Sequence, residues 1–191
     1  MFSVKLVEEE VRICNKHNRG GRTVSTSWKR PKIHIKKTKS EWTWDVIGYV
    51  LYVGSLIFLM VIWDMLPDEV PAHYNAIGEV DRWGSKGELL ILPIIGAFLL
   101  VFLQLIEKYP EVHNYPARLN ESNAEKFYLL SRKLVNQLKN ICLILFAFII
   151  YESASIALGW GSGFSKWFLP LILLGTGIPI IIGVMKQRKI K

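Results

Sequence analysis

The side chains best suited to chemistry lie in one polar segment, residues 66–88, between two strongly apolar stretches. It holds a histidine, an asparagine and several carboxylates, the kinds of group that bind divalent cations or transfer protons. Their spacing matches no established metal motif and no pattern for nucleophilic catalysis, so we expect no catalytic residue, no metal and no cofactor. Two interpretations remain open. The segment is either a ligand or partner site, or a folded loop in which His73 and Asp81 hydrogen-bond to the backbone.

The local composition of this segment predicts a compact fold rather than a flexible connection. Pro67 and Pro71 disfavour helix and impose extended or turn backbone, and Gly78 and Gly84 allow positive φ. Asparagine, aspartate and serine favour turns closed by side-chain bonds to the backbone. The candidate ligand- or partner-binding residues are Pro71, His73, Asn75, Gly78, Asp81, Trp83 and Lys86.

Two further polar residues lie inside apolar stretches, Glu152 and Gln104. An ionised carboxylate in hydrocarbon is costly, so Glu152 is expected to face other helices, with Tyr151, Ser155 and Thr176 as candidate partners. It serves either as a proton or ion relay or as an interhelical hydrogen bond that fixes packing. Gln104 is expected to make another polar contact between helices.

The elements that position these residues are apolar segments of membrane length. The chain is 51% hydrophobic over 191 residues, which is too apolar for a soluble core of this size. Four windows approach or reach the roughly 20 residues that a membrane-spanning helix needs; they are 46–63, 89–106, 141–160 and 167–185. The predicted fold class is therefore all-α, an integral membrane four-helix bundle with a structured extracellular loop between helices 1 and 2.

The basic residues predict the orientation of the bundle, because lysine and arginine are retained on the cytoplasmic side. Residues 1–40 carry eleven of the 24 lysines and arginines, and the connection at 107–138 is also basic. The connection at 64–88 has two basic residues against six acidic ones. We therefore expect a multi-pass protein of the cell membrane with both termini in the cytoplasm.

The division of the chain follows from these segments. We expect a basic cytoplasmic segment of low order at 1–40, a helix-loop-helix unit at 41–106, a cytoplasmic loop with an amphipathic helix at 107–140, and a transmembrane hairpin with a basic tail at 141–191. The amphipathic helix is predicted from the spacing of Phe127, Leu130, Leu134 and Leu138, with Ser122 and Glu125 resembling a capping box.

The net charge of +8 needs no nucleic-acid partner, because the basic residues mostly flank predicted spans, where anionic lipid attracts them. Cys14 and Cys142 have no metal-ligand spacing, and no disulfide is expected. The charged first 40 residues also lack the apolar core of a cleavable signal peptide. The expected partners are the lipid bilayer, an extracellular peptide or another membrane protein, and a cytoplasmic regulator.

The polar segment also resembles a known family, through a long motif held between two predicted membrane helices. The matching residues are Leu66, Pro67, Val70, Pro71, His73, Tyr74, Asn75, Gly78, Asp81, Trp83, Gly84, Ser85 and Lys86. They resemble the bacterial membrane domain of unknown function numbered 1648, DUF1648, over roughly residues 46–106. That domain also occurs at the amino end of SdpI-type immunity proteins, and residues 28–191 are similar to small four-helix members of Gram-positive bacteria.

The resemblance implies an integral membrane protein. For the immunity branch it implies protection from a secreted killing peptide and retention of a repressor at the membrane. Our leading hypothesis is a non-enzymatic envelope sensor or immunity-like protein that recognises a ligand through the outer loop at 67–86. The alternatives are a small transporter or channel subunit that uses Glu152, and a membrane scaffold or assembly subunit.

Overall fold

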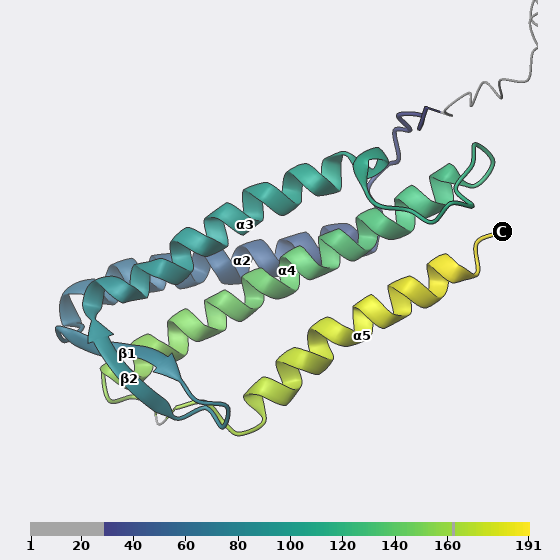
Figure 1. Ribbon diagram of the computed structural model, residues 1–191. Coiled ribbons are helices and arrows are strands. Elements are labelled where there is room, and N and C mark those ends of the chain that lie inside the picture. Colours follow the sequence, from purple (N-terminus) through teal and green to yellow (C-terminus); the bar gives the residue numbers. More distant parts are fainter. Residues whose placement is uncertain (1–28, 162) are drawn as a thin grey trace, which may run out of the picture.

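The computed structural model describes residues 29–161 and 163–191. In this part of the chain, four long helices lie side by side and a two-stranded hairpin closes one end of the bundle (Figure 1). The elements are α2 (Lys39–Ile62), β1 (Glu69–Tyr74), β2 (Val80–Ser85), α3 (Ile91–Lys108), α4 (Ala124–Ala157) and α5 (Phe168–Arg188), with short 3-10 turns at Trp63–Met65, Lys86–Leu90 and Pro110–Val112.

All four helices are long and apolar enough to cross a membrane, which confirms the predicted all-α membrane bundle. We call the end that carries β1 and β2 the hairpin end. The opposite end, where residue 29 and the C-terminus lie, is called the termini end (Figure 1).

α2 begins seven residues before the predicted span because its first turn is capped and two of its carboxylates, Glu41 and Asp45, are buried against the bundle. The backbone N–H of Thr38 donates to Oε2 of Glu41 at 2.7 Å, as in one half of a capping box. The buried residues of α2 then recur every three or four positions, so they form a single stripe that faces the bundle. They are Glu41, Asp45, Gly48, Tyr52, Ser55, Leu59 and Ile62.

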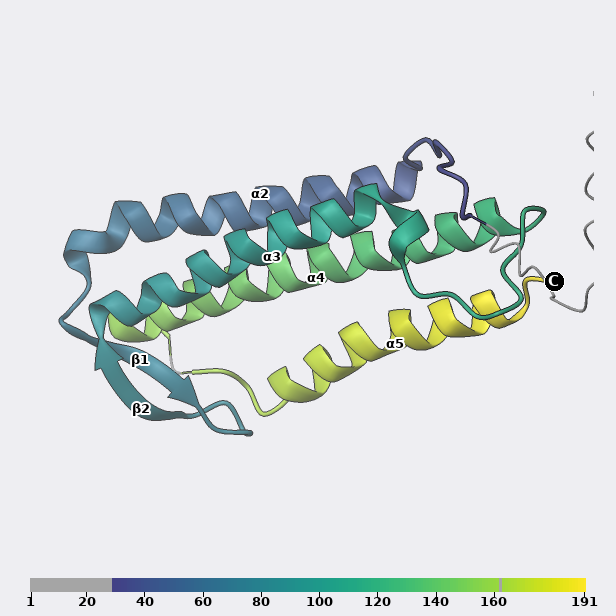
Figure 2. The ribbon, with the colours of Figure 1, turned by 45° about the horizontal axis from the view of Figure 1, so that its top comes forward.

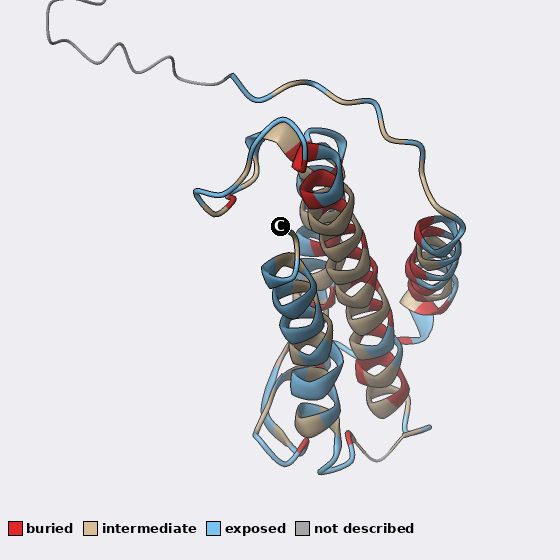
Figure 3. Ribbon diagram, turned by 90° about the vertical axis from the view of Figure 1, so that its right-hand side faces the viewer, coloured by how far each residue is buried: buried red, intermediate tan, exposed pale blue. Residues whose placement is uncertain are grey.

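α4 is a single helix of 34 residues that joins the predicted amphipathic helix to the third predicted span. Its N-cap is Asn123, and the predicted capping box at Ser122 is wrong, because the Ser122 hydroxyl donates to Oδ1 of Asn120 at 2.6 Å. α4 is the central helix of the bundle, packing against α2, α3, α5 and β1 (Figure 3).

The first turn of α4 buries Phe127, as the apolar pattern predicts, but the next turns bury polar residues instead of the leucines of that pattern. Arg132, Asn136 and Lys139 are buried, whereas Leu130 and Leu134 are only half-buried. The buried polar residues bond to carboxylates of α2 and α3, and those bonds compensate for their removal from water.

β1 and β2 pair antiparallel, with Val70 opposite Gly84 and Pro71 opposite Trp83. The folded loop predicted for this segment is therefore present as a hairpin with two irregularities in its register. Gly78 has φ +89°, as expected. Gly84 does not have positive φ; it is needed for space, because a Cβ there would lie 2.9 Å from Cβ of Ala72.

α5 packs mainly against α4 and has no buried residue (Figures 2 and 3). One close approach is at Gly183, where an added Cβ would lie 3.1 Å from Cδ2 of Leu134. Near the termini end, Arg118 donates to the carbonyl oxygen of Gln187 at 2.6 Å. α5 is therefore attached along one side of α4 and leaves most of its surface for lipid.

Candidate functional site

The hairpin is fastened to α4 by one tyrosine. Oη of Tyr74 and Oγ of Ser153 lie 2.7 Å apart, and the ring of Tyr74 meets that of Phe164 edge-on with centroids 4.5 Å apart. Burial raises the pKa of Tyr74, the Ser153 bond partly offsets this, and the nearby charge of Glu152 raises it further. Val70, which is fully buried, adds an apolar anchor in a cluster with Leu59 and Ile150. A movement of the hairpin would therefore pull directly on the end of α4.

Asn75 and Gly78 build the tip of the hairpin. Oδ1 of Asn75 accepts from the backbone N–H of Ile77 at 3.1 Å and of Glu79 at 3.0 Å. Gly78 is buried, and its carbonyl oxygen accepts from the N–H of Phe164 at 3.0 Å. These two candidate residues thus shape the loop and hold it against the segment that precedes α5.

Three other candidate residues lie on the exposed surface of the hairpin. Nδ1 of His73 and Oδ1 of Asp81 are 2.6 Å apart, with side chains 63% and 42% exposed. They bond to each other, so the interpretation in which these two side chains bond to the loop backbone is wrong in that detail. Trp83 is half exposed. His73, Asp81 and Trp83 together offer a polar and aromatic surface to a ligand.

Pro71 and Lys86, the two remaining candidate residues, pack against other parts of the protein. Pro71 is buried in β1. Nζ of Lys86 lies 4.9 Å from the ring centroid of Trp63 and 3.4 Å from the carbonyl oxygen of Leu66, to which it donates. Lys86 therefore links the end of β2 to the end of α2.

The hairpin end is acidic. Asp64, Asp68 and Glu69 are exposed and form no ion pair within residues 29–161 and 163–191. Arg82 pairs with Glu88 at 2.8 Å, which leaves the negative charges in excess. Among the described residues, no three histidine, cysteine or acidic side chains are grouped as a metal site. The available charge is suited to attracting cations from solution.

Glu152 lies near the hairpin end of α4, five residues before the helix ends. It is half-buried, and its Oε1 would be 3.2 Å from a Cβ added to Gly161. None of the three candidate partners bonds to it in the described structure, and the Thr176 hydroxyl donates to the carbonyl oxygen of Ile172 instead.

The other intramembrane candidate, Gln104, does make a polar contact, as expected. Its Oε1 accepts from Oη of Tyr49 and from Nζ of Lys139, each at 2.7 Å. This contact is the edge of a larger buried ion network at the termini end, which the sequence reasoning did not foresee.

The network centres on two carboxylates and two lysines. Nζ of Lys139 lies 2.7 Å from Oε2 of Glu107 and 3.0 Å from Oδ1 of Asp45. Nζ of Lys37 pairs with both carboxylates as well, 2.9 Å from Oε1 of Glu107. Asn136 donates to Asp45 at 2.8 Å and to Glu107 at 3.2 Å. The four charges balance, and they tie together α2, α3 and α4.

A second buried pair fixes the extended segment before α2. Nε of Arg132 donates to Oε1 of Glu41 at 2.8 Å, and its other nitrogens donate to the carbonyl oxygens of Ile35 and Lys36. Burial alone would lower the pKa of Lys37, but its hydrogen bonds to Asp45 and Glu107 raise that pKa overall. The segment is thus held by charge as well as by packing.

The sequence did contain a signal for this network. Glu41 and Asp45 are four residues apart in α2, on the same stripe as its buried apolar residues. Arg132, Asn136 and Lys139 have the matching spacing in α4. Acidic residues on one helix stripe and basic or amide residues on another indicate an interhelical network, whereas counting charges only assigns them to a membrane surface.

The network and Glu152 are not joined by polar side chains along α4. Between Asn140 and Ser153, its buried residues are Leu143, Ala147 and Ile150, which are all apolar. A proton or ion relay needs closely spaced polar groups. In the described structure this stretch therefore separates the two polar regions of α4.

Comparison with known proteins identifies the hairpin and its flanking helices. The family model described as "Domain of unknown function (DUF1648)" matches residues 50–104. An uncharacterized protein of Archaeoglobus fulgidus is 41% identical over 85 residues, a match that covers 37% of this chain and 46% of the relative. The match therefore spans less than half of that relative's length. No solved structure matches the chain significantly.

Proposed function

Residues 50–104 are a DUF1648 domain. From that premise we propose that this membrane protein is a non-enzymatic envelope sensor and that its hairpin binds a cationic peptide. The hairpin end would face outward and both termini would lie in the cytoplasm, in keeping with the basic residues of the termini end. An immunity-like role against a peptide toxin is the physiological form of this proposal. The observation that carries it is the exposed, unpaired acidic surface around the hairpin.

The charges supply the attraction. Asp64, Asp68 and Glu69 are exposed on the turn before β1 and at its start, and none is neutralised by a described residue. Carboxylates on an exposed rim steer a cationic ligand and make its binding sensitive to salt. Trp83, half exposed, adds an aromatic surface for the apolar side chains that membrane-active peptides carry.

The connection to α4 supplies a route for a signal. Tyr74 bonds to Ser153 in the last turns of α4, and the opposite part of the same helix carries Arg132 and Lys139. A ligand that shifts the hairpin would bias the position of this one helix, whose far end holds the ion network. A cytoplasmic regulator could respond to that end.

The binding step can be tested with the full chain in proteoliposomes and a fluorescent cationic amphipathic peptide. The double variant Asp68→Asn with Glu69→Gln should weaken binding several-fold at low salt, and the difference should vanish at high salt. The matched control is Glu121→Gln with Glu125→Gln, which removes the same charge at the termini end. Equal binding by both double variants and the unsubstituted protein would exclude the acidic hairpin end as the attracting surface.

The physiological role needs a separate test in a peptide-sensitive strain. Cells that express the protein should survive a secreted cationic peptide better than cells that express the Asp68→Asn, Glu69→Gln variant. Loss of protection with Trp83→Ala or with His73→Ala would show that the binding surface also includes the middle of the hairpin. Unchanged survival across all variants would exclude the immunity-like role, and binding in proteoliposomes would then point to sensing alone.

A further inference from the structure

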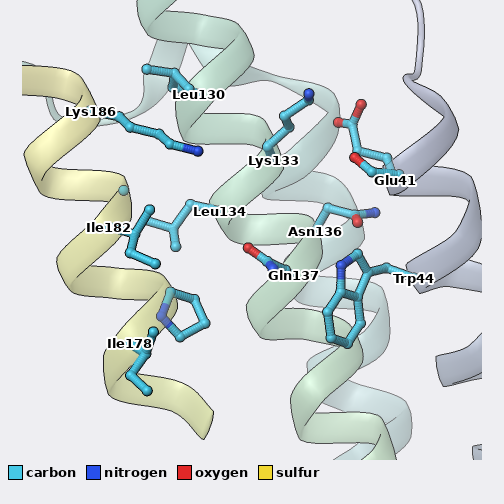
Figure 4. Close-up of a pocket in the computed structure, with 13 residues that line it drawn as sticks. Glu41, Trp44, Leu130, Lys133, Leu134, Asn136, Gln137, Ile178, Ile182 and Lys186 are labelled. Carbon is cyan, nitrogen blue, oxygen red and sulfur yellow. The ribbon is translucent and has the colours of Figure 1, made fainter. Parts of the chain in front are cut away.

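Three cavities lie on the side of α4 that faces α2 and α5, and they change in character along the helix. The one at the termini end, about 400 Å³, lies between α2, α4 and α5 (Figure 4). The second, about 420 Å³, lies between α2 and α4 farther toward the hairpin end. The third, about 270 Å³, lies between α4 and α5.

The first cavity is amphipathic. Lys133 of α4 and Lys186 of α5 line the part nearest the termini end, and Figure 4 shows Lys186 extending from α5 toward α4. Trp44 and Ile178 line it deeper in the bundle, Ile178 being eight residues, or about 12 Å, along α5 from Lys186. Glu41 also lines this cavity, but its carboxylate is paired with Arg132 at 2.8 Å, so the two lysines leave an excess of positive charge above an apolar lower part.

The two lysines are available to a ligand. Within residues 29–161 and 163–191, neither Lys133 nor Lys186 forms an ion pair, whereas the neighbouring Arg132 and Lys139 are fully engaged in the buried network. The lining of this cavity also holds an unused polar atom, because Oδ1 of the buried Asn136 has no described hydrogen-bond partner. The cavity therefore offers two cations and an acceptor.

The other two cavities lie farther toward the hairpin end, one between α4 and α2 and one between α4 and α5. The cavity between α2 and α4 is lined by apolar side chains apart from Ser55 and Tyr151, and it includes Gly54. The cavity between α4 and α5 is lined only by apolar side chains and Gly175. Ile144 and Phe148 of α4 line both, so one helix separates two apolar channels.

We propose that this face binds one anionic phospholipid, with its phosphate at Lys133 and Lys186 and its two acyl chains in the separate apolar cavities. A headgroup hydroxyl, as in phosphatidylglycerol, would donate to Asn136. Basic pockets between membrane helices are suited to anionic headgroups, and two apolar cavities lie farther along the same helix. The bound lipid fills the space between α2 and α5 and completes the bundle. This site is separate from the peptide surface at the hairpin end.

The headgroup can be tested with the full chain purified in detergent and titrated with phosphatidylglycerol or phosphatidylcholine of identical acyl chains, with bound lipid counted by native mass spectrometry. Phosphatidylglycerol should bind at least about tenfold more tightly, and Lys133→Gln with Lys186→Gln should abolish that preference. The control Lys108→Gln with Lys126→Gln removes two lysines at the same end outside the cavity, and it should keep the preference.

The acyl chains are tested by filling the apolar cavities. A Cβ added at Gly54 or at Gly175 meets nothing within 4 Å, so Gly54→Leu with Gly175→Leu should fold and yet bind phosphatidylglycerol several-fold more weakly. Unchanged unfolding temperature in lipid-free detergent verifies folding of every variant. Equal binding of the two lipids, an unaltered preference in the Lys133, Lys186 variant, or full competition by inorganic phosphate would each overturn the proposal. Unchanged binding by the leucine variant would overturn the placement of the acyl chains.

Discussion

The two ends of the bundle treat charged side chains in opposite ways. At the hairpin end, His73 and Asp81 pair in the open, and Asp64 stands alone in water. At the termini end, Asp45 and Lys139 are almost completely buried and bond across helices that are far apart in the sequence. The first arrangement leaves charge free to meet a ligand, and the second uses charge to hold the helices in one arrangement.

The difference has an energetic side. An exposed pair such as His73 and Asp81 contributes little to folding, because water screens it. A buried pair gains only a modest net stability over an apolar alternative, yet removing one partner is costly because the other is left uncompensated. Substitutions at the termini end should therefore test folding, and those at the hairpin end should test binding.

The largest effect is expected from Lys139→Met. It leaves Asp45 and Glu107 with only Lys37 as a cationic partner in a buried site, so it should destabilise the protein by about 3–5 kcal/mol. Thermal unfolding in detergent, followed by tryptophan fluorescence, measures this. Lys126→Met, on the exposed side of the same helix, is the control and should change little.

A second substitution tests whether the stability lost in Lys139→Met comes from the unbalanced charge. Adding Glu107→Gln to Lys139→Met restores the balance of charge, with Lys37 and Asp45 remaining, and should recover part of the lost stability. If Lys139→Met unfolds at the temperature of its Lys126 control, the network does not hold the helices and the contrast between the two ends disappears.

The next effect belongs to the hairpin end and is local. Gly78→Ala places a Cβ 2.5 Å from the carbonyl oxygen of Phe164 at a φ of +89°, so it should cost about 1–3 kcal/mol in the hairpin. Hydrogen exchange should rise in residues 69–85 and stay unchanged at Lys139. Gly54→Ala, with open space around its Cβ, is the control. Faster exchange at both ends alike would show that they do not fold as separate units.

These expectations also show what the sequence could and could not predict. The four spans follow from runs of apolar residues, and a folded loop between the first two from Pro71, Asn75 and Gly78, because both signals are local; the pairing of two strands within that loop was not predicted. The pairing of Glu41 with Arg132 joins residues 91 positions apart, and no local pattern contains it. Charge counting placed Arg132 in a basic cytoplasmic connection and made no use of Glu41, since it takes no account of which side of a helix a residue occupies.

The candidate site was predictable to a similar degree. The residue types of the hairpin pointed to a ligand surface, but their spacing did not separate exposed His73 from buried Pro71 and Gly78. That division depends on how the hairpin lies against α4 and Phe164, contacts made by residues about 80 to 90 positions later in the chain. Similarly, how far Glu152 lies from the hairpin end of the bundle depends on where α4 ends, which the apolar pattern alone did not fix.

Tyr74→Phe should have a smaller effect, because it removes only the bond between the hairpin and Ser153 and keeps the ring against Phe164. We expect a cost of about 0.5–1.5 kcal/mol. Hydrogen exchange should increase in residues 150–157 as well as in the hairpin, which would show that the two are coupled. An increase confined to the hairpin would remove the proposed route for a signal, and Tyr151→Phe serves as the control.

Glu152→Gln distinguishes the sensor from the transporter. Because Glu152 bonds to no described residue and an apolar stretch separates it from the network, we expect a stability change within about 0.5 kcal/mol and no change in proton or cation flux through proteoliposomes. The matched change Glu125→Gln, at the opposite end of α4, should behave alike. Flux in the unsubstituted protein that disappears only with Glu152→Gln would favour the transporter and contradict a purely structural separation of the two ends.

The smallest expected effect is a dependence of the protein's stability on pH, which comes from Lys37 at the termini end. The pKa of Lys37 is raised above its usual 10.5, because the hydrogen bonds to Asp45 and Glu107 outweigh the cost of burial. The stability that its charge contributes is therefore complete below 10.5 and is lost as pH rises through the higher value in the folded protein. Unfolding temperatures of the unsubstituted protein and of Lys37→Gln should differ below pH 10.5 and converge above it. A gap between the unsubstituted protein and Lys37→Gln that stays constant with pH would mean that packing, rather than charge, attaches the segment before α2.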